Sequence, residues 1–142
     1  MADILLVDDD ANLCLVLRQM LEHMGHTVRC ARNGIEVMRI YEKDSSMDLI
    51  ITDIFMPEKE GLETIREVRR INPRQKIIAM SGGGGGSGPD TFLHIAQRTG
   101  ASAILLKPFS YTELANAITD VLSQPDSPAP AGTGGNSSQP RA

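Results

Sequence analysis

Four short apolar segments of this chain each end on residues that can take part in catalysis or metal binding. The segments are ILLV from residue 4, LIIT from residue 49, IIAM from residue 77 and AILL from residue 103. The polar residues that directly follow them are Asp8 and Asp9, then Asp53, Ser81 and Lys107. If three carboxylates, a hydroxyl and an ammonium came together, they could hold a divalent metal ion and move a phosphoryl group.

The three aspartates carry the donor atoms that a hard cation prefers. Mg²⁺ is bound by oxygen ligands, keeps several waters and takes only one or two carboxylates directly. Asp9 and Asp53 suit that role, with Asp8 holding a metal-bound water. Three clustered carboxylates repel one another and raise one another's pKa values, and Lys107 would offset part of that charge.

The same residues could form an aspartyl-phosphate. A carboxylate that attacks a phosphoryl group gives this covalent adduct, and a metal ion neutralises the phosphoryl oxygens and fixes their direction. Asp53 is the best candidate for the nucleophile because it stands alone after its apolar segment. Ser81 and Lys107 can bind the remaining phosphoryl oxygens.

The stretches between the apolar segments have the periodicity and end signals of helices. Apolar residues from Leu13 to Met24 recur at spacings of three and four, which predicts one helix with an apolar stripe. The start signals of the predicted helices are, in chain order, Asp10, the pair Asn33 and Glu36, Gly61, Pro89, and the pair Ser110 and Glu113. The stop signals are Gly25, Asn72 with Pro73, and Gly100.

Five predicted strands, including a short one over residues 27–31, alternate with five predicted helices. Apolar runs of four suit strands that are buried on both faces, as in a parallel sheet. Right-handed crossovers then make a doubly wound α/β domain with helices on both faces. In the flavodoxin-like strand order 2-1-3-4-5, ligands bind at the carboxyl edge, where strands 1 and 3 are neighbours. Asp8, Asp9 and Asp53 are therefore expected to lie together at that edge.

Composition and charge narrow the class of protein. The chain has 142 residues, of which 41% are hydrophobic, enough for one domain with one core. Its formal net charge of -4 argues against nucleic acid as a direct partner. No apolar run approaches the roughly 20 residues that span a membrane, and the first residues lack the features of a signal peptide. We therefore expect a cytoplasmic protein without direct nucleic-acid or membrane contacts.

Two further features bear on domain organisation. Cys14 and Cys30 are interpreted as buried thiols rather than as a disulfide. From Gln124 onward, proline, glycine and serine replace any apolar periodicity, as is typical of disordered segments. We expect one folded domain over residues 1–123 and a disordered tail over residues 124–142.

With their neighbours, the residues at the strand ends resemble the receiver domain of two-component response regulators. The resemblance covers about residues 3–123. The matching motifs are Val7-Asp8-Asp9, Asp53-Ile54-Phe55-Met56-Pro57 with Gly61, Ser81-Gly82, and Lys107-Pro108-Phe109. Each motif is weak alone, but their order and spacing on successive strands are specific.

The resemblance implies a role for each residue of the site. Asp53 would accept a phosphoryl group from a histidine kinase or a histidine phosphotransfer protein. Asp8 and Asp9 would bind Mg²⁺ together with Asp53 and the backbone carbonyl of Phe55. Ser81 and Lys107 would contact the phosphoryl group, and the peptide bond between Lys107 and Pro108 would be cis.

The resemblance also implies how such a protein works. It would be a stand-alone phosphoacceptor that promotes its own phosphorylation and dephosphorylation and converts no separate substrate. Its output would be contact with a downstream protein, and it could equally pass the phosphoryl group onward in a relay or act as a phosphate sink. The expected surface comprises the fourth helix, the fifth strand and the fifth helix, with candidates His94, Gln97, Arg98 and Glu113.

The chain departs from the usual family pattern in three places. Ile104 stands where relatives have a switch aromatic, so the signal would need another route. A glycine run over residues 82–88 follows Ser81 and is expected to be mobile, because glycine is costly to order. Phe55 and Gly83 stand where many relatives have polar side chains, and we hypothesise that Phe55 shields the acyl phosphate and prolongs its lifetime.

Two other functions remain open on the sequence alone. Asp8-x-Asp10 after an apolar strand resembles the opening of haloacid-dehalogenase-type phosphatases, which would make Asp8 the nucleophile of a Mg²⁺-dependent enzyme. Asn12 departs from that pattern, and the chain has no cap and little room for a substrate pocket. A nonphosphorylated interaction scaffold is the third possibility.

The basic run from Arg66 to Arg74 is interpreted as a solvated helix end.

Overall fold

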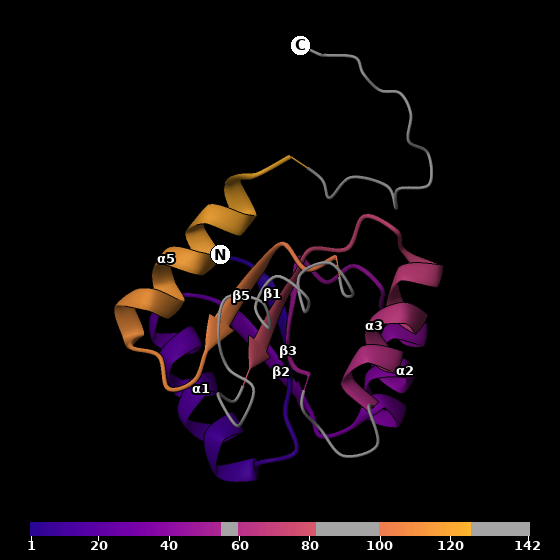
Figure 1. Cartoon of the computed structure of the whole chain (residues 1–142), viewed down its shortest axis with the longest axis horizontal. Coiled ribbons are helices and arrows are strands. Elements are labelled where there is room, and N and C mark those ends of the chain that lie inside the picture. The colour runs from indigo at the N-terminus through magenta and orange to yellow at the C-terminus, as the bar shows by residue number, and fades with distance from the viewer. Residues whose placement is uncertain (55–59, 82–99, 126–142) are drawn as a thin grey trace.

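A computed structural model of the chain describes residues 1–54, 60–81 and 100–125 (Figure 1). Its elements are β1 Asp3–Val7, α1 Ala11–His23, β2 Thr27–Ala31, α2 Gly34–Lys43, β3 Leu49–Asp53, α3 Glu60–Ile71, β4 Ile77–Ser81, β5 Ala103–Leu106 and α5 Tyr111–Ser123. None of the described helices is long and apolar enough to cross a membrane.

The five strands form one parallel sheet in the order β2-β1-β3-β4-β5. This order confirms the predicted flavodoxin-like topology. Val7 at the end of β1 is paired with Ala31 on one side and with Thr52 on the other. The residues that follow β1 and those that end β3 therefore lie next to each other at the carboxyl edge of the sheet.

Helices cover both faces of the sheet, and each face has its own apolar cluster. In Figure 1, α1 and α5 lie on one side and α2 and α3 on the other. Alternate residues of β1 point to opposite faces: Ile4 and Leu6 pack with α1 and α5, whereas Leu5 and Val7 pack with α2 and α3. Burial on both faces explains why the strands read as continuous apolar runs.

Among the described residues, the predicted helix-end signals lie at the helix ends, and one cap differs in detail. Asp10 caps α1, since its carboxylate accepts from the main-chain N–H groups of Asn12 and Leu13 at 3.0 and 3.1 Å. Gly25, just after α1, has a φ of +99°, a conformation that glycine adopts without strain. Ser110 and Glu113 form the predicted reciprocal capping box of α5.

The cap of α2 differs from the prediction in one detail. Asn33 accepts from the N–H of Glu36 at 2.9 Å as expected, but the Glu36 carboxylate accepts from the N–H of Arg32 at 2.7 Å. The carboxylate thus reaches one residue before the cap. Such a shift is not visible in the spacing of the two residue types.

Several predictions fall on residues outside the described ranges. They concern the fourth helix after Pro89, the glycine run over residues 82–88, Phe55, and the tail from residue 126 onward. The surface candidates His94, Gln97 and Arg98 also lie outside the described residues.

A buried polar pair closes the amino edge of the sheet. The Tyr41 hydroxyl on α2 donates to Gln75 Oε1 at 2.7 Å, and Gln75 Nε2 donates to the carbonyl of Met47 at 3.1 Å. Both Tyr41 and Gln75 are buried. Buried polar groups need such partners, so this pair joins α2 to the entries of β3 and β4.

We expect Tyr41→Phe to lower the free energy of unfolding by about 1–2 kcal/mol, because the buried amide of Gln75 would lose this donor. Urea unfolding followed by circular dichroism measures the loss. Tyr111→Phe is the matched control, because the Tyr111 hydroxyl contacts His23 Nδ1 at the surface. That control is expected to cost less than about 0.5 kcal/mol, and equal losses in the two variants would contradict the account.

Candidate metal and phosphoryl site

The candidate site lies at the carboxyl edge of the sheet, where three of its elements end. Asp8 directly follows β1, Asp53 is the last residue of β3, and Lys107 directly follows β5. Because β1 and β3 are adjacent, the two carboxylates meet without any distortion of the sheet.

Three carboxylates converge at this edge, as predicted. One ligand oxygen from each of Asp8, Asp9 and Asp53 lies within 4.8 Å of the others. Asp8 is 1% exposed and Asp53 is 6% exposed, whereas Asp9 is exposed to solvent. The donor set, all carboxylate oxygen and open on the side of Asp9, fits a hard divalent cation that keeps part of its water shell.

Lys107 joins the two buried carboxylates. Its Nζ lies 2.9 Å from Asp8 Oδ2 and 3.1 Å from Asp53 Oδ2. Its main-chain N–H donates to the carbonyl of Ser81 at 2.8 Å, which fixes the backbone where β5 ends. The peptide bond between Lys107 and Pro108 is cis, which confirms that expectation.

Ser81 ends β4 on the other side of Asp53. Asp53 is paired with Met80, so Ser81 is the next residue along the neighbouring strand. Ser81 is buried, and its carbonyl accepts the hydrogen bond from Lys107. Ser81 therefore lies at the end of β4, as the sequence predicted.

Burial and charge act in opposite directions on the titration of the site. Burial raises the pKa of Asp8, and the N–H of Asp10 and the ammonium of Lys107 oppose that rise. Burial alone would lower the pKa of Lys107, but its contacts with Asp8 and Asp53 outweigh burial and raise it. Burial thus weakens the preference of Asp8 for its charged form, whereas the ammonium of Lys107 is held firmly charged at neutral pH.

These shifts link protonation to folding with defined signs. Because the pKa of Asp8 is raised, its contribution to stability is complete below its ordinary value of 3.8 and is lost as the pH rises through the raised value. Because the pKa of Lys107 is also raised, its contribution is complete below 10.5 and is lost as the pH rises through the raised value. At neutral pH the ion pair therefore offsets part of the cost of ionising Asp8.

Two contacts that hold Asp8 were not predicted from the sequence. The N–H of Asp10 donates to Asp8 Oδ1 at 2.9 Å, and Cys14 Sγ donates to the Asp8 carbonyl at 3.3 Å. Burial raises the pKa of Cys14 to about 12, so the thiol keeps its proton and can donate. The Asp-x-Asp spacing is a signal for the first contact, because an aspartate often accepts from the N–H two residues later.

Asp10 itself stays apart from the acidic cluster. Its carboxylate caps α1, and among the described residues the cluster consists of Asp8, Asp9 and Asp53. Phe55, the fourth expected ligand, lies outside the described residues.

Comparison with known families identifies the family to which this fold belongs. The model of the response regulator receiver domain matches residues 4–119. The chain belongs to the receiver domains of response regulators. This family receives phosphoryl groups from histidine kinases in two-component signalling and is not a classical enzyme family.

Individual curated relatives also match this chain. The chain is 38% identical over 128 residues to the DNA-binding transcriptional regulator NtrC of Azospirillum brasilense, a match that covers 90% of this chain and 26% of the relative. It spans about a quarter of the length of the first curated relatives it matches.

Solved structures of receiver domains have the same fold. A receiver domain protein of Clostridium thermocellum is 30% identical with a TM-score of 0.75, and the match covers 86% of this chain and 94% of that one. The chemotaxis protein CheY4 of Vibrio cholerae is 27% identical with a TM-score of 0.75, and the match covers 85% of this chain and 98% of that one.

We expect Lys107→Met to lower the free energy of unfolding by about 2 kcal/mol at neutral pH, because two buried carboxylates would lose their shared cation. The loss should shrink as the pH falls through the raised pKa of Asp8, since protonation of Asp8 removes one of the repelling charges. Urea unfolding at several pH values measures both effects. Lys43→Met, an exposed lysine at the end of α2, is the control, and a loss at Lys107 that does not vary with pH would contradict this electrostatic explanation.

Proposed function

We propose that this receiver domain accepts a phosphoryl group on Asp53 from a histidine kinase or a histidine phosphotransfer protein, in a reaction that requires Mg²⁺. The convergence of Asp8, Asp9 and Asp53 within 4.8 Å, with Lys107 bonded to two of them, is the observation that carries the proposal. Asp8, Asp9, Asp53 and the backbone carbonyl of Phe55 would hold the ion.

Each residue of the site would have a separate role in phosphoryl transfer. A carboxylate oxygen of Asp53 would attack phosphorus while the bond from phosphorus to the donor imidazole breaks, and the imidazole keeps the electron pair. Bound Mg²⁺ would supply positive charge to the phosphoryl oxygens. The ammonium of Lys107, now 3.1 Å from Asp53 Oδ2, is close enough to bind a phosphoryl oxygen on that residue, and the Ser81 hydroxyl would bind another.

Asp53 is preferred to Asp8 as the nucleophile because of what surrounds Asp8. Both oxygens of Asp8 accept hydrogen bonds, one from the N–H of Asp10 and one from Lys107. Asp8 is also the more buried of the two carboxylates. This environment argues against the alternative of a phosphatase with Asp8 as its nucleophile, and it suits a residue that orients a metal-bound water.

The proposed output is contact with a downstream protein through β5, α5 and the segment that precedes β5. In the described part of this face, a groove of about 360 Å³ is lined by Ile104, Leu105, Leu106, Phe109, Glu113 and Asn116. Ile104 packs against the cluster on the side of α2 and α3. Because an isoleucine lacks the reach of an aromatic ring, we propose that displacement of Ser81 and Lys107 reaches this face through the backbone bond between them.

Labelling with acetyl phosphate or a cognate kinase tests the acceptor. We expect wild-type protein to gain a base-labile phosphoryl group only with Mg²⁺ present, and we expect Asp53→Asn to abolish the adduct. If Asp53→Asn is still labelled and Asp8→Asn is not, Asp8 is the nucleophile. If no variant and no condition gives an adduct, the chain is a nonphosphorylated scaffold.

Calorimetric titration with Mg²⁺ tests the proposed ligands. Asp9→Asn is expected to weaken Mg²⁺ binding by at least about tenfold, because it removes a direct ligand. Asp10→Asn is the matched control: it removes the same charge one residue away, and asparagine still caps a helix, so binding should change by less than about threefold. Similar effects at the two positions would show that general charge, not coordination by Asp9, holds the ion.

A further inference from the structure

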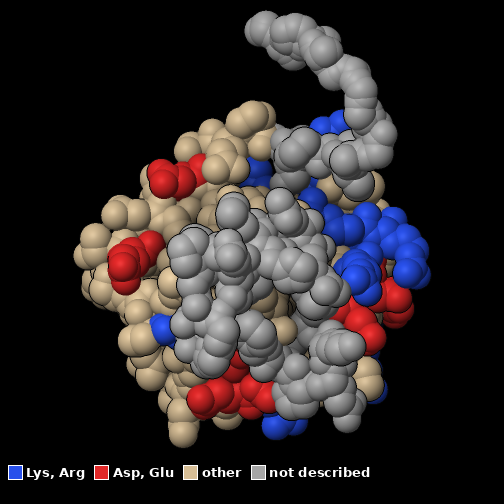
Figure 2. All heavy atoms as spheres, viewed as in Figure 1, with Lys and Arg blue, Asp and Glu red and all other residues tan. Residues whose placement is uncertain are grey.

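Positive charge gathers at the opposite end of the molecule from the carboxylates. Residues 66–76, the end of α3 and the loop before β4, contain five of the chain's lysines and arginines and only one acidic residue, although the chain as a whole has a net charge of -4. In Figure 2, blue side chains gather over the end of α3, and further blue atoms stand apart from them. We call this area the α3 basic surface; its cations are Arg66, Arg69, Arg70, Arg74 and Lys76.

Most of this charge has no carboxylate partner. Among the described residues, Arg70 alone of the five forms an ion pair, with Glu67 at 3.4 Å. Arg69 donates to the carbonyls of Pro73 and Gly100, and Lys76 donates to the carbonyls of Leu122 and Gln124. Carbonyl oxygens satisfy these donors without cancelling their charge, so the surface keeps a positive field.

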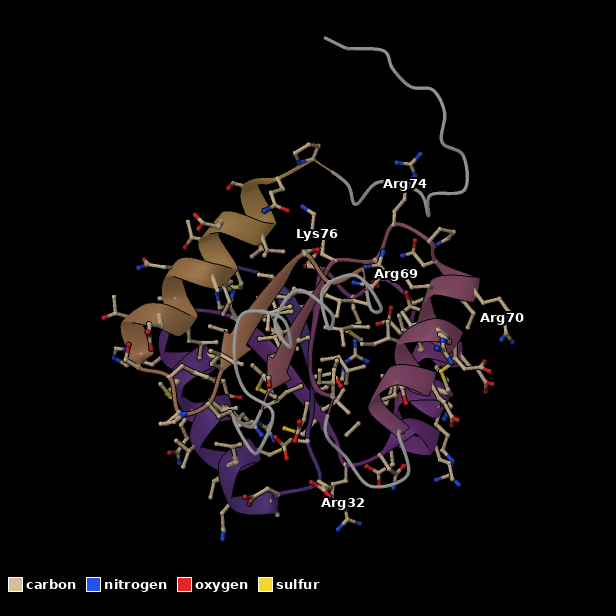
Figure 3. All side chains as sticks on the ribbon, viewed as in Figure 1. Arg32, Arg69, Arg70, Arg74 and Lys76 are labelled. Carbon is tan, nitrogen blue, oxygen red and sulfur yellow. The ribbon has the colours of Figure 1, made fainter. Side chains whose placement is uncertain are left out.

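The helix dipole of α3 explains the position of only some of these cations. Arg69 and Arg70 stand in the last turn of α3, where cations are stabilised. Arg74 and Lys76 lie beyond the helix. Figure 3 shows Arg70 and Arg74 extending outward, while Arg69 and Lys76 lie nearer the sheet. The inner pair thus donates to main-chain carbonyls, whereas the outer pair extends into solvent, where Arg70 stays 72% exposed despite its ion pair with Glu67.

The surface also offers an apolar contact and a hollow. Ile71, between Arg70 and Arg74, is 50% exposed. Beside Arg74 and Lys76 lies a hollow of about 350 Å³, whose remaining lining is Met47, Asp48, Asn72, Gln75 and Leu122. The carboxylate of Asp48 already accepts from the N–H of Asp3 at 2.8 Å, and the two cations outnumber it.

We propose that the α3 basic surface binds an acidic polypeptide segment of a partner protein, with an apolar side chain of that segment over Ile71. This contact is separate from the proposed phosphoryl switch, because it lies at the other end of the strands. Carboxylates of the partner pair with Arg70 and Arg74, and one of them enters the hollow beside Lys76.

Two observations favour a protein over a nucleic acid as the partner. Ile71, which follows Arg70 in the chain, is half-exposed, and an apolar side chain makes no favourable contact with a phosphate backbone. The rest of the chain is more acidic than the whole, so it repels a long polyanion that extends beyond this small area. A short acidic segment with one apolar residue avoids that repulsion and complements both features.

Fluorescence anisotropy with labelled probes tests the proposal on the full chain. The main probe is a polyglutamate peptide with a central leucine, and the comparison probes are the same peptide with serine in place of leucine and an oligothymidylate of equal charge. The double variant Arg70→Gln with Arg74→Gln is matched by Arg18→Gln with Arg32→Gln, which removes the same charge from exposed sites elsewhere. Figure 3 shows Arg32 at the far end of the molecule from Arg74.

The expected results separate this proposal from its alternatives. The leucine peptide should bind wild type best, the Arg70 and Arg74 double variant should weaken that binding at least about tenfold, and the control pair should change it less than about twofold. Ile71→Ser should remove the preference for leucine over serine. Asp53→Asn should leave binding unchanged, which keeps the result independent of phosphorylation.

Three results would overturn the proposal. They are an equal loss in the control pair, tighter binding of the oligothymidylate than of the leucine peptide, and no saturable peptide binding below about 1 mM.

Discussion

The carboxylates of Asp8 and Asp53 are both buried and share one ammonium, that of Lys107, at the carboxyl edge of the sheet. Like charges held this close in a partly dry site repel strongly, and a flexible chain would separate them. They stay together because each is anchored at the end of a strand whose apolar residues are in the core. Lys107 is 99 residues from Asp8 and 54 from Asp53 along the chain, so the fold itself assembles the site.

The rest of the domain serves to hold that edge in place. Two apolar clusters, one on each face, fix the strands and their register. The N–H of Asp10 and the thiol of Cys14 hold Asp8 from two sides, while the carbonyl of Ser81 holds the backbone of Lys107. The acidic cluster lies at the carboxyl edge of the sheet, and the α3 basic surface lies at the amino edge. These two ends of the molecule therefore carry charges of opposite sign.

Sequence patterns predicted what depends on local order in the chain. The apolar runs gave the strands and their buried faces, the residues at the strand ends gave the site, and Asp10, Ser110 and Glu113 gave helix caps. Contacts between distant residues were not predictable in this way. Neither the bond from Tyr41 to Gln75 nor the one from Lys76 to the end of α5 leaves a periodic signal, because each depends on how elements pack. The bond from Cys14 to the Asp8 carbonyl is closer in sequence, but it was not predictable either, because a buried cysteine does not indicate which group its thiol contacts.

The central claim is that the carboxylate of Asp53, and not that of Asp8, takes the phosphoryl group. Reduction of the phosphorylated protein with borohydride converts an acyl phosphate to an alcohol, and peptide mass spectrometry then locates the altered residue. The account predicts that Asp53 is converted to homoserine, that Asp8 and Asp9 are unchanged, and that omission of Mg²⁺ prevents the conversion. Homoserine in place of Asp8, with Asp53 intact, would contradict it.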